Sequence, residues 1–329
     1  MNRRGAFKRR STPKKILGLT HKTAVTIRAG KHLLSKTTAH LLSRARTSRC
    51  IFRAYFALPP LNHSTGLPTH AIYGFTNLLL KFLKQYRPEY VAVVLDAGRE
   101  TFRNQMFAAY KGNRREPPAD LIPQFPYFRR VLEGLQIALL ELAGYEADDV
   151  IASVCHTIAG HGCDLVVVSS DKDFMQLVTD GIRLLDGAKD RWIGAAEVNG
   201  KFGVEPAKVI EVMGLMGDAV DNIPGVKGIG EKTAIGLIQR FGTLENLFSR
   251  LDEIEHLELR GAARLRRMLE DGRDAAFLSR DLATVRRDAP ISISLEQLKF
   301  TGFDGEKLRR LFVELEFTNL AKLLENGRI

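Results

Sequence analysis

Acidic residues recur at positions where folding could bring them together. Asp96 ends an apolar run, Tyr-Val-Ala-Val-Val-Leu at 90–95, and two more acids follow a second apolar run at 164–169. Such runs are typical of buried parallel strands, whose carboxyl ends line the ligand-binding edge of a sheet. Two acid pairs spaced three residues apart, the first with Asp148 beside it, complete the set, because that spacing places both members of a pair on one helix face. The eight candidates are Asp96, Glu146, Asp148, Asp149, Asp171, Asp173, Asp218 and Asp221.

Carboxylates gathered in this way favour metal chemistry. Like charges in one pocket repel one another and raise one another's pKa unless a cation compensates them. Ligand sets made only of oxygen suit hard divalent ions such as Mg²⁺ or Mn²⁺. Two such ions about 4 Å apart stabilise the attacking and leaving oxygens of a phosphodiester. A single Asp is more often a helix cap or a solvated surface residue, so the prediction depends on the set.

A glycine-rich turn at 222–234 is the second feature with chemical meaning. Gly228 and Gly230 stand directly before a predicted helix, and Lys227 and Lys232 flank them. Glycines let the backbone approach a phosphate, and a helix N-terminus supplies N–H donors. Contacts of this kind bind nucleic acid through its backbone without reading bases. An ordinary tight turn is the alternative.

The segment 99–118 mixes cations with aromatic residues. Its aromatic side chains could stack on unpaired bases while the cations hold phosphates. In the alternative interpretation, Phe102 and Phe107 anchor an amphipathic surface helix. Lys111 and Arg114, three residues apart, could also stabilise charge developing on a phosphate.

The elements that would position these residues divide the chain. Apolar residues recur at helical spacing at 71–83, and helices are also predicted at 124–143 and 148–158, between and beside the two strands. Strands that alternate with helices predict a doubly wound, mostly parallel α/β sheet. After about residue 200 the pattern is helical, with helices at 207–216 and 231–241 and a short strand possible at 291–295. We therefore expect a core over 51–200 and a helical domain over 201–329.

Composition limits the class of protein. The 329 residues carry a formal net charge of +11, but residues 1–50 hold 14 Lys or Arg and no acid, which leaves 35 basic and 38 acidic residues in the rest. Such a basic leader is typical of an organellar transit peptide, a nucleic-acid tail, or a disordered or misassigned start. Three cysteines without a CxxC pair argue against a zinc knuckle or a disulfide framework. The sequence has no apolar run near the roughly 20 residues of a membrane span.

Several motifs in fixed order resemble the 5′ nucleases, most closely the 5′–3′ exonuclease (flap endonuclease) domain of bacterial DNA polymerase I. The resemblance covers about residues 51–325. It rests on Leu-Asp-Ala (95–97), Thr-Phe-Arg (101–103), Tyr-Lys-Gly-Asn-Arg (110–114), Gly-Tyr-Glu-Ala-Asp-Asp-Val (144–150), Ser-Ser-Asp-Lys-Asp (169–173) and the glycine-rich segment 217–234.

The resemblance implies a role for each candidate residue. Asp96, Glu146, Asp148 and Asp149 match mainly one metal cluster of that family, and the other four acids match mainly the second. A helical arch is implied at about 99–125, and a DNA-binding helix–three-turn–helix, often with bound K⁺, at 217–240. Catalytic roles are implied for Lys111, Arg114 and Arg53, and DNA contacts for Tyr110, Arg103, Gly225, Lys227, Gly228, Gly230, Lys232 and Thr233.

The resemblance also implies an activity and a setting. It implies a PIN-like nuclease core in which a metal-activated water cleaves DNA near a 5′ junction and leaves a 5′-phosphate and a 3′-hydroxyl. The expected cofactors are two or more Mg²⁺ or Mn²⁺ ions, and the expected partner is flap, nicked or gapped DNA. A monomeric, nucleoid-associated enzyme of the bacterial cytoplasm is implied, without a membrane, or an organellar one if residues 1–50 are a transit peptide.

One departure from the family pattern concerns the first metal cluster. The family begins with a strand that ends in Asp-Gly, seven residues before the Arg that matches Arg53, but Arg46 and Thr47 stand here. Residues 23–30 could form a strand, yet they bring no carboxylate. We expect that residues 1–50 replace the family's usual start and that cleavage is weak. A catalytically impaired junction-binding protein is therefore the alternative function, and a PIN-like ribonuclease toxin is a third.

Overall fold

The computed structural model describes residues 38–42 (backbone), 55–56, 58–114, 116–159, 163–187, 189–256 and 261–329. Residues 36–329 form one compact unit. Within it, a six-stranded sheet has the order β3-β2-β1-β4-β5-β6. The strands are β1 (Thr38–Leu42), β2 (Tyr90–Val94), β3 (Ala138–Leu140), β4 (Asp164–Val168), β5 (Ile182–Asp186) and β6 (Arg191–Ile193).

The sheet is parallel except at one edge. β1 pairs in parallel with β2 and with β4, so that Leu42 lies opposite both Val93 and Val168. β3 and β5 extend the parallel part, and only β6 is antiparallel to its neighbour. The predicted doubly wound, mostly parallel sheet is confirmed.

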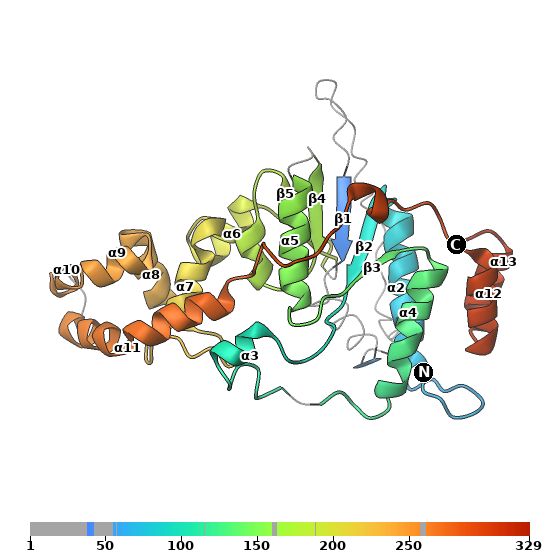
Figure 1. Ribbon diagram of the computed structural model, residues 1–329, viewed down its shortest axis with the longest axis horizontal. Helices are drawn as coiled ribbons and strands as arrows, with labels where there is room; N and C mark the ends of the chain where they lie inside the picture. The colour runs from blue at the N-terminus through green and yellow to red at the C-terminus, as the bar shows by residue number, and fades with distance from the viewer. Residues whose placement is uncertain are drawn as a thin grey trace, which may run out of the picture. The chain divides into compact units, whose positions relative to one another are not determined.

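No pattern in the sequence predicts the central strand, β1. Figure 1 shows β1 between β2 and β4, at Thr38–Leu42. The strand suggested at 23–30 lies outside the described residues. The strand at Thr38–Leu42 is short and contains a histidine, and its pairing with a neighbour on each edge supplies what its own propensity lacks.

The helices follow the predicted alternation, with two differences. The predicted helix at 124–143 ends early, because β3 occupies its second half, and residues 291–294 form no strand. The helices are α2 (His70–Tyr86), α3 (Phe102–Met106), α4 (Phe125–Gly134), α5 (Ala147–Ala159), α6 (Ala195–Phe202), α7 (Val209–Met216), α8 (Glu231–Phe241), α9 (Leu244–Ser249), α10 (Asp252–Glu255), α11 (Ala262–Ala283), α12 (Gly305–Glu314) and α13 (Thr318–Glu325), with 3₁₀ turns η1 (Ile122–Gln124), η2 (Asp173–Leu177), η3 (Pro206–Lys208) and η4 (Leu295–Leu298).

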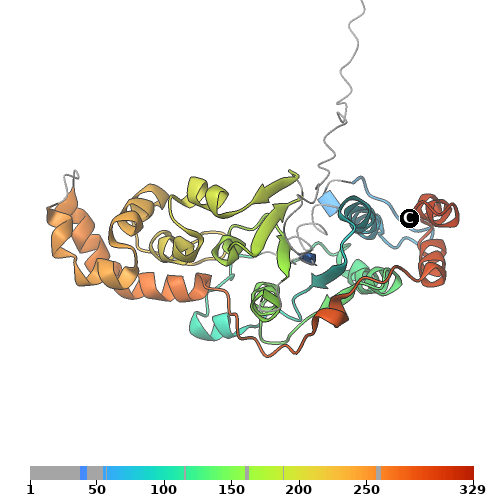
Figure 2. The same ribbon diagram turned by 90° about the horizontal axis from the view of Figure 1, so that it is seen from above.

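Alternate side chains of β2 enter two separate hydrophobic layers. Val91 and Val93 pack with α2, α4, α12 and α13 on one face. Ala92 and Val94 pack with α5 on the other face, in a layer that continues into α7, α8 and α11. The last two helices therefore pack on the core beside α2 and α4, away from the α7–α11 group (Figure 2). No helix in the described ranges is long and apolar enough to cross a membrane.

Candidate metal site and nucleic-acid interface

The end of β2 is joined to the start of α5. Asp96, two residues beyond β2, accepts a hydrogen bond from the backbone N–H of Ala147 at 2.7 Å. Asp148 and Asp149 lie in the first turn of α5, where the positive end of the helix dipole favours carboxylates. The predicted approach of the first acid group to the carboxyl end of the sheet is therefore present.

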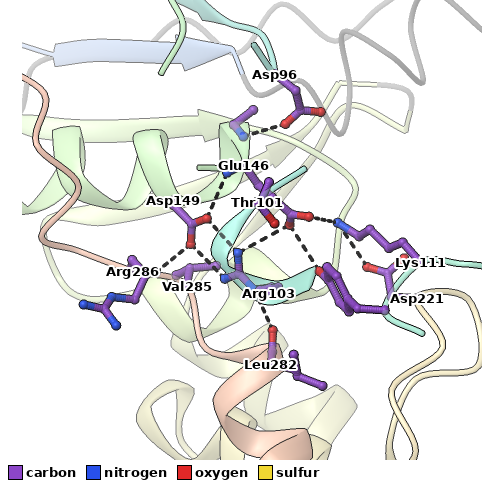
Figure 3. Close-up of polar contacts among 12 residues, drawn as sticks. Asp96, Thr101, Arg103, Lys111, Glu146, Asp149, Asp221, Leu282, Val285 and Arg286 are labelled. Atoms are coloured by element: carbon purple, nitrogen blue, oxygen red, sulfur yellow. Dashed lines mark hydrogen bonds and ion pairs between the residues drawn. The ribbon is translucent and has the colours of Figure 1, made fainter. Parts of the chain in front are cut away.

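Within this group, Asp149 turns inward and pairs with Arg103. The Arg103 guanidinium donates to both carboxylate oxygens, at 2.7 and 2.8 Å, and its Nε donates to the carbonyl of Leu282. The backbone N–H groups of Glu146 and Arg286 also donate to Asp149 (Figure 3). Asp149 is 0% exposed and Arg103 is 2% exposed. This buried pair joins α3, α5 and the end of α11.

This geometry corrects two expectations from the sequence. Both oxygens of Asp149 are already bound by donors, which leaves this carboxylate unsuited to the metal-ligand role expected for it. Arg103 is enclosed by protein, so it does not present its charge to DNA as expected. The i, i+3 spacing could not reveal this, because the partner of Asp149 comes from a segment 46 residues earlier.

Glu146 faces the arch segment instead. Lys111 Nζ lies 2.6 Å from Glu146 Oε1, and the hydroxyl of Tyr110 donates to Oε2 at 3.2 Å. Tyr110 is only 4% exposed, and burial raises the pKa of its hydroxyl. Its ring is packed in the core, in contrast to the DNA contact expected for it. In the described part of the segment 99–125, the helical residues are those of α3, η1 and the first residue of α4, so its helical part is short.

The second acid group lies beyond β4 and in the turn after α7. The backbone N–H of Asp173 donates to Asp171 at 3.2 Å. Asp218 pairs with Lys172 at 2.9 Å, and Asp221 pairs with Arg114 at 2.5 Å. Lys172, which stands between two acids in the sequence, is a site residue that the sequence reasoning missed.

The two groups approach each other at Lys111, whose Nζ lies 2.6 Å from Glu146 Oε1 and 3.6 Å from Asp221 Oδ2. Removal from water and the charge of Asp171 raise the pKa of Asp148 well above its usual range. Burial, followed by the charges of Asp171 and Asp221, raises the pKa of Asp173 to about 8. The Oδ1 atom of Asp173 is buried without a hydrogen-bond partner. Acids from both groups therefore repel one another in one region.

The donor chemistry of this region fits a hard divalent cation. Carboxylate oxygens predominate, and the orphaned Oδ1 of Asp173 is an oxygen that a cation would satisfy. Among the described residues, no group of three or more acids already lies close enough to hold an ion. Lys111, Arg114 and Lys172 pair with the acids instead. Arg46 and Arg53 lie outside the described residues.

The glycine turn separates buried from exposed positions. Gly225 is buried because its backbone packs against Gly217, where an added Cβ would lie 2.5 Å from the Gly217 nitrogen. Gly225 therefore allows two backbone segments to pack closely, and its burial prevents the DNA contact expected of it. The other expected DNA-binding positions are exposed: Lys227, Gly228, Gly230, Lys232 and Thr233.

The exposed part of the turn leads into α8. Gly230 is the N-cap of this helix and has an extended backbone, and no side chain caps the helix. Lys232 and Thr233, in the first turn of α8, are exposed. This arrangement has the polarity of an anion-binding helix N-terminus.

Comparison with known proteins identifies the class of this chain. Residues 47–203 match the model of the 5′-3′ exonuclease N-terminal resolvase-like domain, and residues 204–306 match that of the 5′-3′ exonuclease C-terminal SAM fold. The 5′-3′ exonuclease of Aquifex aeolicus is 38% identical over 275 residues, which cover 84% of this chain and 92% of that protein. The chain belongs to the 5′-3′ exonuclease family.

A second relative and a solved structure are also similar to this chain. DNA polymerase I of Bacillus caldotenax is 40% identical over 283 residues, 85% of this chain and 32% of that protein, so this chain spans about a third of such relatives. The bacteriophage T5 flap endonuclease, in a pseudo-enzyme–product complex with DNA and metal ions, shares the fold with a TM-score of 0.58 and 21% identity. That match covers 88% of this chain and 98% of the T5 chain.

Proposed function

We propose that this protein is a structure-selective 5′ nuclease that hydrolyses DNA phosphodiesters as a 5′–3′ exonuclease and 5′-flap endonuclease. The observation that carries the proposal is that acids of both groups meet at Lys111, whose Nζ lies 2.6 Å from Glu146 Oε1 and 3.6 Å from Asp221 Oδ2. Among the described residues, the buried Oδ1 of Asp173 has no hydrogen-bond partner, and a cation would satisfy it. The relatives support DNA as the substrate. Primer removal in replication and repair of DNA would be its cellular roles.

The residues of the site would have three different roles: metal binding, phosphate binding and support of the fold. Asp148, Asp171 and Asp173 would hold two or more Mg²⁺ or Mn²⁺ ions. When bound, such ions supply a nucleophilic water at neutral pH and stabilise charge on the phosphate. Lys111 and Arg114 pair with Glu146 and Asp221 of the site. They would exchange these carboxylates for the scissile phosphate when DNA binds. The buried Arg103–Asp149 pair would hold α3 and α5 in place.

The exposed glycine turn would bind the duplex next to the cleavage point. Lys227 and Lys232 would pair with phosphates, and the N–H groups of α8 would contact the same strand, with K⁺ as a further ion at this turn. Lys232→Gln should lower the slope of log affinity against log salt by about one. Lys84→Gln, a substitution at the end of α2, should leave that slope unchanged. Equal slopes in all three proteins would argue against this interface.

Cleavage of a 5′-flap duplex tests the activity directly. We expect Mg²⁺-dependent release of the flap and its loss in EDTA. The cleavage rate should fall by about a hundredfold or more in Asp173→Asn, because Asp173 is one of the three acids proposed to hold the ions. Glu325→Gln, an exposed substitution on α13, is the matched control and should cleave normally. Full activity of Asp173→Asn would exclude this acid from the site.

A catalytically impaired DNA-junction-binding protein is the second candidate function. The observation that favours it is Arg46, at the position where the family pattern has its first metal-binding Asp. Tight binding of the flap duplex without cleavage in Mg²⁺ or Mn²⁺ would support this alternative. We propose a monomer acting in the bacterial cytoplasm, near the nucleoid, in either case.

A further inference from the structure

Two turns that are far apart in the sequence are joined by reciprocal hydrogen bonds from asparagine side chains. The side-chain amide of Asn113 donates to the carbonyl of Ala219 at 2.9 Å. The side-chain amide of Asn222 donates in the opposite direction, to the carbonyl of Ala109 at 2.6 Å. Between them, the backbone N–H of Lys111 donates to the carbonyl of Asp221 at 2.9 Å. We call residues 107–114 the arch turn and residues 218–223 the carboxylate turn.

Each turn is closed by its own backbone hydrogen bonds. In the arch turn, Tyr110, Gly112 and Arg114 each donate to the carbonyl three residues earlier. In the carboxylate turn, Asp218 and Ile223 exchange both backbone hydrogen bonds. Because each turn is closed by its own hydrogen bonds, the three hydrogen bonds between the turns hold one turn against the other.

The contact has a consequence for the cations of the site. Lys111 and Arg114 belong to the arch turn and reach Glu146 and Asp221 from it. The carboxylate turn overlaps the start of the glycine turn (222–234), whose exposed DNA-binding positions begin at Lys227. A duplex bound at the glycine turn would therefore contact residues that continue directly from the carboxylate turn. The carboxylate turn is in turn hydrogen-bonded to the arch turn.

We propose that Asn113 and Asn222 are positioning residues that couple duplex binding at the glycine turn to the placement of Lys111 and Arg114. The proposal rests on the proposed function, since it assumes that the glycine turn binds duplex DNA. It assigns no contact with substrate to either asparagine. Neither residue was singled out from the sequence, because an Asn in a turn usually serves only its own turn.

The decisive variant removes both side-chain amides without straining the backbone. Asn222 has a φ of 56°, in the left-handed region, so Asn222→Gly keeps this conformation where Ala would oppose it. Asn113 has no such restriction and is replaced by Ala. The double variant N113A/N222G is compared with Asn77→Ala, whose side-chain amide donates to the carbonyl of Tyr73 within α2. Thermal unfolding establishes that each variant is folded.

Hydrogen exchange measures the coupling without cleavage. A blunt duplex without a single-stranded flap is added in Ca²⁺, so that the arch turn has no strand of its own to bind. In the wild type and in Asn77→Ala, we expect the duplex to slow exchange in residues 107–114 by about tenfold. In the double variant this protection should be lost while duplex affinity changes by less than about twofold.

Single-turnover cleavage of a flap supplies the second readout. The double variant should cleave about tenfold more slowly at saturating DNA, because misplaced cations lower the rate and not the affinity. Persistence of the protection in the double variant, or its absence from the wild type despite duplex binding, would overturn the coupling alone. Failure of the wild type to bind any duplex would overturn the proposed function together with it.

Discussion

At the residue scale, the acids of the site differ in ways that their spacing conceals. The sequence places Glu146, Asp148 and Asp149 in one short segment, and of these three Asp148 is the acid that feels the charges of Asp171 and Asp173. Burial then separates them, because Asp149 meets Arg103 in the core while Glu146 meets Lys111 at the surface of the site. The partners come from a segment more than 30 residues earlier, which no local pattern can identify.

The buried Arg103–Asp149 pair predicts a large effect on stability. Asp149→Asn leaves a buried guanidinium without its counter-charge, so the free energy of unfolding should fall by about 3–5 kcal/mol. Urea unfolding measures this change, with Glu325→Gln as the exposed control within about 0.5 kcal/mol of the wild type. A stable Asp149→Asn protein with weakened Mn²⁺ binding would instead return Asp149 to the set of metal ligands.

The raised pKa of Asp173 predicts how stability depends on pH when metal is removed. Because its pKa rises from 3.8 to about 8 on folding, the folded state holds a proton that the unfolded state has released. The free energy of unfolding in EDTA should therefore fall as pH rises from about 4 to about 8, by at most about 1.4 kcal/mol per pH unit from this group.

Urea unfolding of the metal-free protein between about pH 5 and about pH 8 checks this dependence. Asp173→Asn should flatten the decline, because the amide does not titrate, whereas Glu325→Gln should keep it. Saturating Mn²⁺ should flatten the decline in the wild type as well, since a bound cation favours the ionised carboxylates. An unchanged slope in Asp173→Asn would assign the pH dependence to other groups.

At the element scale, the glycine turn is the best predicted part of the site, but only as a sequence of glycines before a helix. Sequence reasoning treated Gly225, Gly228 and Gly230 alike as phosphate contacts. In the structure, Gly225 instead allows two backbone segments to touch, while Gly228 and Gly230 remain exposed. A glycine needed for close packing and one needed for a ligand have the same sequence signature.

Two glycine substitutions in this element should have opposite effects. Gly225→Ala adds a Cβ that meets the backbone of Gly217, at a φ of 60°, and should lower the free energy of unfolding by about 1–3 kcal/mol. Gly236 lies within α8, where an added Cβ meets no atom within 4 Å, so Gly236→Ala should raise it by about 0.5–1 kcal/mol.

Urea unfolding and duplex affinity together check this pair of variants. Gly225→Ala should also weaken duplex binding, because the turn that presents Lys227 and the N-terminus of α8 is displaced. Gly236→Ala should bind as the wild type does. A Gly225→Ala protein as stable as the wild type would contradict the close approach of the two backbone segments.

At the scale of the whole molecule, the alternation of strands and helices was sufficient to predict the sheet but not its centre or its ends. Apolar runs identified β2 and β4 because both strands are buried on both faces. β1 is not predictable in this way, because a five-residue strand depends on pairing with its two neighbours more than on its own residue types. The return of α12 and α13 to the core is a long-range contact that a local helical pattern does not encode.

Position 46 bears on whether the proposed set of metal-binding acids is complete. The eight acids come from four segments, and the resemblance to the family leaves one carboxylate missing, at Arg46. A cation at that position would oppose metal binding, whereas a carboxylate would add a ligand and remove a positive charge. Arg46→Asp should therefore raise Mn²⁺ affinity and flap cleavage by about 10–100-fold, the range that changes around a metal site commonly produce.

The matched control is Arg44→Asp, which makes the same change of charge two residues earlier. If position 46 completes the ligand set, Arg46→Asp gains metal affinity and activity while Arg44→Asp does not. Equal gains in the two variants would mean that the net charge of the leader, and not a ligand, limits the protein. A folded Arg46→Asp protein without any gain would show that this position does not correspond to the family's first Asp.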